Sequence, residues 1–129
     1  MPRNISFSMT KDQFLDGSKD VTRRMGWLNA KEGDVLNAVE KAMGLKKGEK
    51  IKSLGAIRVK HVRREPLRRM LDEPAYGARE CQREGFPKMR TPDFVEFFCK
   101  GHKGCIPDST VTRIEFERIT SDVEGGCNE

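Results

Sequence analysis

The sequence predicts an α+β fold: a small mixed β-barrel of about five or six strands, with helices inserted before the last strand. Apolar and polar residues alternate at the start, middle and end of the chain, over residues 5–9, 54–62 and 110–119. Helical patterns precede the last of these segments, over residues 66–71, 75–84 and 91–98. Because the first and last strands must both find partners, we expect the sheet to curl and the helices to cover its opening.

The composition fits one small domain. The chain has 129 residues, of which 36% are hydrophobic and 35% charged, with a net charge of +5. We expect a single domain over residues 1–120 and a disordered tail over 121–129. No apolar run reaches the length of a membrane span, and the first residues do not resemble a signal peptide. We therefore expect a cytoplasmic monomer with no membrane contact and no cofactor.

The first elements follow from local patterns. Residues 5–9 alternate as a half-buried strand does. Thr10 and Gln13 fit a capping box that opens a short helix, and Gly17 is suited to end it. Residues 21–25 are then expected to form a second strand.

The middle of the chain is expected to hold two more strands. Residues 35–39 favour a strand, although their alanine content also allows a helix. A loop rich in lysine and glycine follows over residues 44–53. Residues 54–62 give the strongest strand prediction, in which Ile57 begins the alternation and Val62 breaks it as a bulge does.

The helices and the final strand complete the prediction. Pro66 is suited to the first turn of a short helix, and residues 75–84 are compatible with a second. Thr91 and Pro92 predict the start of a third, with the threonine as its cap. Residues 110–119 alternate again and form the last strand.

Charge is distributed unevenly along the sequence. Cations dominate residues 44–70, and acidic residues dominate from Asp108 onward. A one-sided basic field is typical of a surface that contacts a nucleic-acid backbone. A solubilising surface explains the same charges equally well, so both interpretations stay open at this point.

The segment 17–24 groups several polar side chains within a turn and the strand after it. Thr22 and Arg24 lie two apart, so on a strand they share one face while Arg23 points to the other. Lys19 lies in the preceding turn and can fold over the same face. A lysine, a hydroxyl and an arginine that converge would suit a phosphate or a polar base edge. The alternative is a solvated basic turn.

An ordered set of motifs resembles the ASCH domain, a branch of the PUA-like superfamily, in the form that phages encode. The motifs are Gly17-x-Lys19-x-x-Thr22-x-Arg24, Gly33-Asp34-Val35-Leu36, Glu84-Gly85-Phe86, the helix over 91–98 and the ending 111–116. The resemblance implies a barrel with a cleft that faces RNA, a nucleoside or a modified base.

One branch of that family suggests chemistry for these positions. In the small amidohydrolases that deacetylate N4-acetylcytidine, a lysine, a threonine and a glutamate form the active site, and they match Lys19, Thr22 and Glu84, with Arg24 beside them. The resemblance implies that the lysine activates the threonine hydroxyl and the acid protonates the leaving amine. Desolvation or crowding by cations would lower the pKa of the lysine, and Arg23 and Arg24 supply the crowding.

Two classes of function therefore stay open. The first is a module that binds RNA or a modified nucleoside, and the size of the basic field favours it slightly. Its candidate contacts are Lys19, Arg23, Arg24, Trp27, Lys46, Lys47, Lys50, Arg63 and Arg64. The second is a hydrolase, either an amidohydrolase or a ribonuclease, that uses Lys19, Thr22 and Glu84. A phage-borne inhibitor of a host protein is a third hypothesis.

Some of these residues also have a structural role available. Glu84 could serve as an ion-pair partner, Thr22 as a strand former and Trp27 as a core residue.

A second group of residues raises the question of a metal. Cys99, His102 and Cys105 provide three soft ligands on one turn, and Cys81 could complete a zinc site. The paired Cys-x2-Cys elements of strong zinc motifs are absent, so we expect no metal here. The expected cytoplasmic location also disfavours a Cys99–Cys105 disulfide.

Overall fold

The computed structural model describes residues 3–7, 9–40, 48, 50 and 52–119. The predicted tail lies outside this part of the chain. The elements, in chain order, are β1 (Arg3–Ser6), α1 (Lys11–Asp16), β2 (Val21–Arg24), β3 (Val35–Val39), β4 (Ser53–Pro66), α2 (Arg69–Asp72), α3 (Pro74–Arg83), α4 (Thr91–Lys100) and β5 (Thr110–Ile119). None of the described helices is long and apolar enough to cross a membrane.

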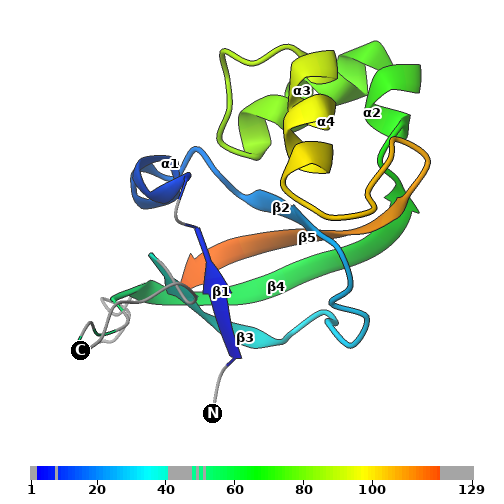
Figure 1. Ribbon diagram of the computed structural model, residues 1–129. Helices are drawn as coiled ribbons and strands as arrows, with labels where there is room; N and C mark the ends of the chain where they lie inside the picture. Colours follow the sequence, from blue (N-terminus) through cyan, green and yellow to red (C-terminus); the bar gives the residue numbers. More distant parts are fainter. Residues whose placement is uncertain (1–2, 8, 41–47, 49, 51, 120–129) are drawn as a thin grey trace.

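The five strands form one mixed sheet in the order β1-β3-β4-β5-β2. β1 pairs with β3 in parallel, and the other pairs are antiparallel. The sheet curls into a half-barrel that brings its two edge strands towards each other (Figure 1). Arg24 on β2 joins them by donating a hydrogen bond from Nη2 to the carbonyl oxygen of Ser6 on β1, at 2.6 Å. The structure thus confirms an α+β, barrel-like fold with helices inserted before the last strand.

The long pair of β4 and β5 forms the centre of the sheet. Their register runs from Ala56 opposite Ile119 to Pro66 opposite Thr110, and it shifts between Val59 and His61. The irregularity therefore lies before the Val62 position that the sequence suggested. Pro66 ends β4, so its prediction as a helix residue is wrong; a proline is tolerated at a strand end because no further ladder bond is needed there.

Apolar side chains gather in two cores. The first packs α1 against the curled sheet, with Phe7, Phe14 and Phe116 in mutual contact. The second joins α2, α3 and α4 to the far end of β4 and β5 and contains Met70 and Phe94. The helices sit over that end of the sheet, and α1 lies apart from them (Figure 1).

Two predicted helix caps are not formed. Thr10 precedes α1 but makes no capping hydrogen bond with its side chain. Thr91 is the first residue of α4 rather than its cap, which is Arg90. The helices are held by their buried faces, and this tertiary packing makes the caps dispensable. Residues 35–39 form a strand, which excludes the helical alternative.

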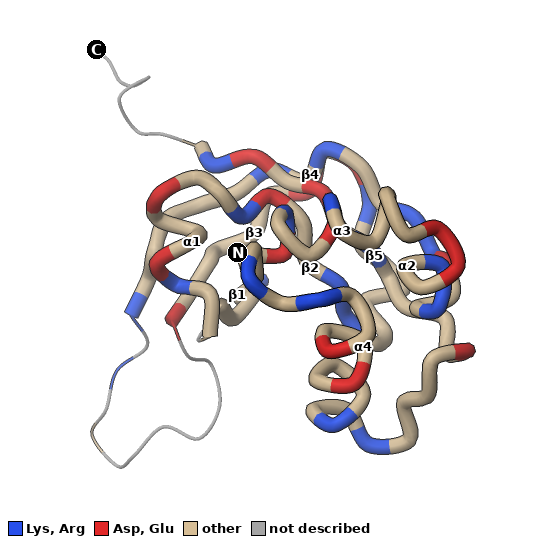
Figure 2. Tube along the Cα trace, turned by 90° about the horizontal axis from the view of Figure 1, so that it is seen from above, with Lys and Arg blue, Asp and Glu red and all other residues tan. Residues whose placement is uncertain are grey.

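The cations of β4 do not form a one-sided field, because the sheet register places acidic residues of β5 beside two of them. Arg58 lies 3.3 Å from Glu117, and Lys60 lies 3.8 Å from Glu115. Blue and red segments are accordingly interspersed over the molecule in Figure 2. The charge of this surface is much more balanced than the linear sequence suggests.

Candidate functional site

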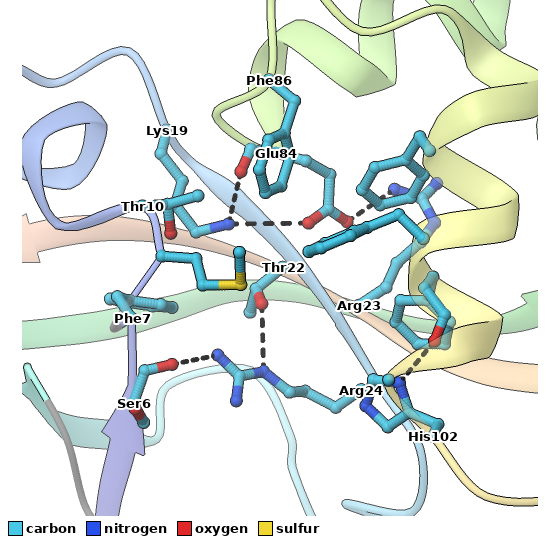
Figure 3. Close-up of a pocket in the computed structure, with 15 residues that line it drawn as sticks. Ser6, Phe7, Thr10, Lys19, Thr22, Arg23, Arg24, Glu84, Phe86 and His102 are labelled. Carbon is cyan, nitrogen blue, oxygen red and sulfur yellow. Dashed lines mark hydrogen bonds and ion pairs between the residues drawn. The ribbon is translucent and has the colours of Figure 1, made fainter.

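Lys19 is fixed in the turn between α1 and β2. Gly17 adopts a left-handed conformation (φ 87°) that ends the helix, and the backbone of Lys19 then donates to the carbonyl oxygen of Gln13 at 3.1 Å. The side chain is only 3% exposed. Its ammonium donates to the carbonyl oxygens of Val21 at 3.0 Å and of Glu84 at 2.7 Å (Figure 3).

Glu84 reaches the same place from the end of α3, where it caps the helix. Its carboxylate lies between two cations: Oε1 is 3.5 Å from Lys19 Nζ, and Oε2 accepts a hydrogen bond from Arg23 Nη1 at 3.0 Å. The C-terminal end of α3 carries partial negative charge, which favours a nearby cation. The ammonium of Lys19 is therefore stabilised both by this helix end and by the Glu84 carboxylate. The structure brings these two predicted residues together.

The surroundings lower the pKa of the Lys19 amine to about 8. Burial is the largest cause, Glu84 opposes it, and the neighbouring Arg24 and Arg23 reinforce it. Of the two causes that the sequence suggested, burial therefore contributes more than crowding by cations. An amine with this pKa is neutral in a substantial fraction of molecules just above neutral pH, and a neutral amine can accept a proton.

Thr22 and Arg24 share a face of β2, as their spacing predicted. The Thr22 hydroxyl is nearly buried, and its oxygen accepts a hydrogen bond from Arg24 Nε at 3.0 Å. This bond leaves the hydroxyl proton of Thr22 available to another acceptor. Among the described residues, no hydrogen bond joins the Lys19 amine to this hydroxyl; the two groups face the same space from different sides (Figure 3).

Arg23 points the other way and anchors a buried ion network. Its guanidinium contacts Glu80 at 2.7 Å, Glu84 at 3.0 Å and Glu65 at 3.1 Å. Glu80 is 1% exposed and also binds Arg113 at 2.6 Å. Burial alone would raise the pKa of Glu80, but Arg113 and Arg23 outweigh it and lower that pKa to about 2. The network therefore holds one oxygen of Glu84 and orients the other towards Lys19.

A cavity of about 300 Å³ lies between the two apolar cores, and one of its walls is formed by Lys19, Thr22, Arg24 and Glu84. Its other walls are largely aromatic. They are provided by Phe7, Phe86, Phe94, Phe97, Phe98 and His102. The His102 ring stacks on Phe98 with 4.2 Å between centroids, and its Nδ1 is 2.8 Å from the Phe98 carbonyl oxygen. The cavity thus combines flat apolar surfaces with a polar wall that carries both donors and acceptors.

No family model matches the chain, and no curated protein matches it by sequence. Crystal structures of other proteins share its fold, among them the two that follow. Protein EF3133 from Enterococcus faecalis V583, of family DUF984, is 17% identical over 92% of this chain and 80% of its own, with a TM-score of 0.59. Hypothetical protein PH0355 is 16% identical over 92% of this chain and 100% of its own, with a TM-score of 0.62. At these identities the likeness concerns the fold alone.

The sequence prediction missed the aromatic walls and the acidic network. Phe94 and Phe98 lie four residues apart on one face of α4, and His102 follows four residues later, just after the helix. Glu80 and Glu84, at the end of α3, have the same spacing. This spacing indicates an apolar stripe in one case and an acidic stripe in the other. Which part of the molecule each stripe faces depends on how α3 and α4 pack on β2, and no local pattern contains that information.

Other predicted contacts lie away from this cavity. Trp27 stacks under Arg3, with 3.7 Å between the guanidinium carbon and the ring centroid, and lines a separate cavity of about 260 Å³. Arg63 binds Glu65 and the Tyr76 hydroxyl at the rim of the ion network. The remaining predicted contacts are Arg64 and Lys50, which are exposed, and Lys46 and Lys47, which lie outside the described residues.

The residues weighed as zinc ligands are not arranged around one point. The Sγ atoms of Cys99 and Cys105 lie 3.4 Å apart, whereas His102 turns its Nδ1 to the Phe98 carbonyl. Burial and the contact with Cys105 raise the pKa of the Cys99 thiol to about 11. Cys81 contacts Thr91 instead. Within the part of the chain that the structure describes, no three His, Cys, Asp or Glu side chains are grouped as metal ligands.

Proposed function

We propose that this protein binds a nucleoside, either free or as an unpaired residue of RNA, in the cavity between the two cores. The observation that carries the proposal is the pairing of aromatic walls with one polar wall in a single cavity of about 300 Å³. This volume lies at the lower end of the range of small-molecule pockets, about 300–1,000 Å³. It suits one base with its sugar rather than a duplex.

Both kinds of wall match the parts of a nucleoside. A base that stacks on an aromatic ring gains about 1–3 kcal/mol, whichever of the bases it is. Its polar edge then needs donors and acceptors at fixed positions. Lys19 and Arg24 supply donors, Glu84 supplies an acceptor, and the Thr22 hydroxyl supplies either. RNA-binding proteins typically read unstacked bases in this way, so the cavity supports recognition of a single exposed base.

A second candidate function is hydrolysis of an acylated nucleoside, such as N4-acetylcytidine. The specific observation in its favour is that Lys19, with its pKa of about 8, lines the same cavity as Thr22 and Glu84. In this reaction the Thr22 hydroxyl gives its proton to the neutral amine of Lys19 and attacks the acetyl carbonyl. The proton then passes from Lys19 by way of Glu84 to the departing amino group, and a water molecule hydrolyses the acetyl ester, which releases acetate and restores the Thr22 hydroxyl.

The geometry places a condition on this second function. The Lys19 amine donates to two carbonyl oxygens, those of Val21 and Glu84, and its third position faces the Glu84 carboxylate at 3.5 Å. The lone pair of the neutral amine must therefore turn from Glu84 to Thr22 before it can accept the hydroxyl proton. Turnover that depends on the neutral amine should increase as the pH rises through about 8. Binding alone imposes no such condition, and for this reason we place it first.

One experiment tests both functions. Wild-type protein is titrated with cytidine and with N4-acetylcytidine by calorimetry, and acetate release is followed in parallel. We expect saturable binding of at least one nucleoside. Thr22→Val keeps the shape of the side chain without its hydroxyl, so it should weaken binding by no more than about 3 kcal/mol if the site only binds, and abolish turnover if it catalyses.

Glu84→Gln separates the two outcomes further. As a general acid, Glu84 contributes a proton, and its loss should slow turnover by roughly 10²–10⁴-fold. Bound nucleoside that is never cleaved between pH 6 and 9 would exclude the hydrolase and leave the binding function. The absence of binding for every nucleoside tested would contradict both.

A further inference from the structure

Arg24 carries a charge that the described residues do not neutralise. Its guanidinium donates to the Thr22 hydroxyl and to the carbonyl oxygen of Ser6, and both acceptors are uncharged. Among the described residues, no carboxylate lies within 4.0 Å of it. The ring of Phe7 lies 5.5 Å below its central carbon, which compensates the charge only weakly.

The neighbouring cations differ from Arg24 in this respect. Lys19 shares one oxygen of Glu84, and Arg23 contacts the other oxygen together with Glu65 and Glu80. The negative charge of Glu84 is therefore already paired with these two residues, while its oxygens keep lone pairs that can accept further hydrogen bonds. The cavity is lined by three cations and this single carboxylate, so Arg24 leaves it with an excess of positive charge.

The donors of Arg24 are also incompletely used. A guanidinium has five N–H groups in a planar fork, and the two hydrogen bonds of Arg24 use one from Nε and one from Nη2. Nη1 makes no hydrogen bond with the residues that the structure describes. Figure 3 shows the guanidinium between Thr22 and Ser6, on the opposite side of the cavity from Lys19. Such a fork matches the two oxygens of a phosphate or carboxylate.

From these observations we propose that the natural ligand is anionic, and that Arg24 binds the phosphate of a nucleoside monophosphate while the base lies among the aromatic side chains. This inference rests on the proposed binding function and specifies its ligand class. Burial lowers the pKa of Arg24, partly offset by Glu84, and an anion at the fork would relieve this penalty. The phosphate can be that of a free nucleotide or of one residue in RNA.

The test compares matched ligands on wild-type protein. Cytidine, cytidine 5′-monophosphate, cytidine 3′-monophosphate and inorganic phosphate are titrated by calorimetry at low ionic strength. We expect one of the two nucleotides to bind roughly ten-fold or more tighter than cytidine, because charge-assisted hydrogen bonds are the strong ones. The preference between the 5′ and 3′ esters shows which side of the sugar faces Arg24. Inorganic phosphate should bind more weakly than the preferred nucleotide.

Variants then assign the preference to Arg24. Arg24→Gln removes the charge and should bring the preferred nucleotide to the affinity of cytidine. Arg24→Lys keeps the charge without the fork and should retain part of the preference. Arg118→Gln is the matched control, because Arg118 is exposed and bonds only the Leu15 carbonyl among the described residues. Circular dichroism and thermal melting establish that each variant is folded, and the comparison of ligands on wild-type protein stands even if one is not.

The outcomes separate this inference from the proposed function. Cytidine and both nucleotides binding with equal affinity would overturn the anionic ligand and leave nucleoside binding intact. A nucleotide preference that Arg24→Gln leaves unchanged in a folded variant would overturn the role of Arg24. Inorganic phosphate that binds as tightly as the nucleotides would show that the base contributes nothing, and this contradicts both proposals. The same holds if neither cytidine nor a nucleotide binds.

Discussion

At the scale of single residues, the site depends on buried charges that few neighbours compensate. Lys19 is held by two carbonyl oxygens and by one oxygen of Glu84, at a position that is almost inaccessible to water. Desolvation disfavours the charged amine, and the pair with Glu84 only partly restores it. Such a lysine lowers the stability of the folded protein at neutral pH, and strongly shifted pKa values of this kind are typical of functional sites.

This reasoning predicts how stability depends on pH. The pKa of Lys19 is about 8 in the folded protein and 10.5 in the unfolded chain, so between these values the unfolded chain binds more protons. The Lys19 contribution to the free energy of unfolding should therefore rise with pH across this window, by up to about 3 kcal/mol. Charged groups that face the amine are Glu84, Arg24 and Arg23.

Urea denaturation at several pH values between 7 and 10 measures the effect. Lys19→Met removes the titrating group and keeps the apolar stem, so the stability of wild type relative to this variant should increase with pH. A relative stability that stays flat or falls above pH 8 would contradict a lowered pKa at Lys19.

At the scale of the elements, the buried ion network connects α3 to the sheet. Glu80 lies on α3 and binds Arg23 on β2 and Arg113 on β5, and all three side chains are at most 4% exposed. The same network holds Glu84, which faces the cavity. The packing of α3 and the position of the candidate site are thus set by the same contacts.

Glu80→Gln should consequently be costly. It leaves two buried arginines without their shared carboxylate, and breaking a buried pair typically costs about 3–5 kcal/mol. Glu117→Gln is the control, since its pair with Arg58 is half exposed and should be worth no more than about 1 kcal/mol. Chemical denaturation at pH 7 measures both.

Acid titration of the same variants adds a second readout. The pKa of Glu80 is about 2 in the fold and 4.5 when unfolded, so its stabilisation is complete above pH 4.5 and is lost as the pH falls towards 2. Glu80→Gln should flatten this part of the profile. Equal costs for the two substitutions at pH 7 would mean that the network does not hold α3 in place.

At the scale of the whole molecule, pairing along β4 and β5 balances the surface charge. Arg58 and Lys60 of β4 meet acids of β5. Arg68 meets Asp108 at 2.7 Å beyond the other end of this strand pair. The lysines of the preceding loop, Lys46 and Lys47, lie outside the described residues. For a contact with an RNA backbone, we therefore test Lys46 and Lys47 rather than the cations of β4.

We expect single-stranded RNA to bind with an affinity that falls on the order of ten-fold or more between 50 and 200 mM salt, if several phosphates are contacted. Reversing Lys46 and Lys47 to glutamate should weaken binding equally for all sequences. The same reversal at Lys31 and Lys100, which are exposed elsewhere, serves as the control for net charge. Fluorescence anisotropy at several salt concentrations measures the slope. Binding that is absent at low salt, or independent of salt, would contradict contact with an RNA backbone.

The sequence predicted local features well and long-range ones poorly. Alternation identified the first strand and the two long central strands, and the spacing of Thr22, Arg23 and Arg24 correctly divided their side chains between two faces of β2. The resemblance to ASCH proteins predicted that Lys19 and Glu84 meet. The pairing of β4 cations with β5 acids was not predicted, because it depends on a sheet register between segments far apart in the chain.

The central claim is that the cavity lined by Lys19, Thr22, Arg24 and Glu84 is the binding site, and amide NMR of 15N-labelled protein tests it most directly. Titration with cytidine and its monophosphates should shift resonances of residues 19–24, 84–86 and 98–102, with one common saturation curve. Saturable shifts that gather instead around the separate cavity beside Trp27, or no saturable shifts at all, would contradict the claim.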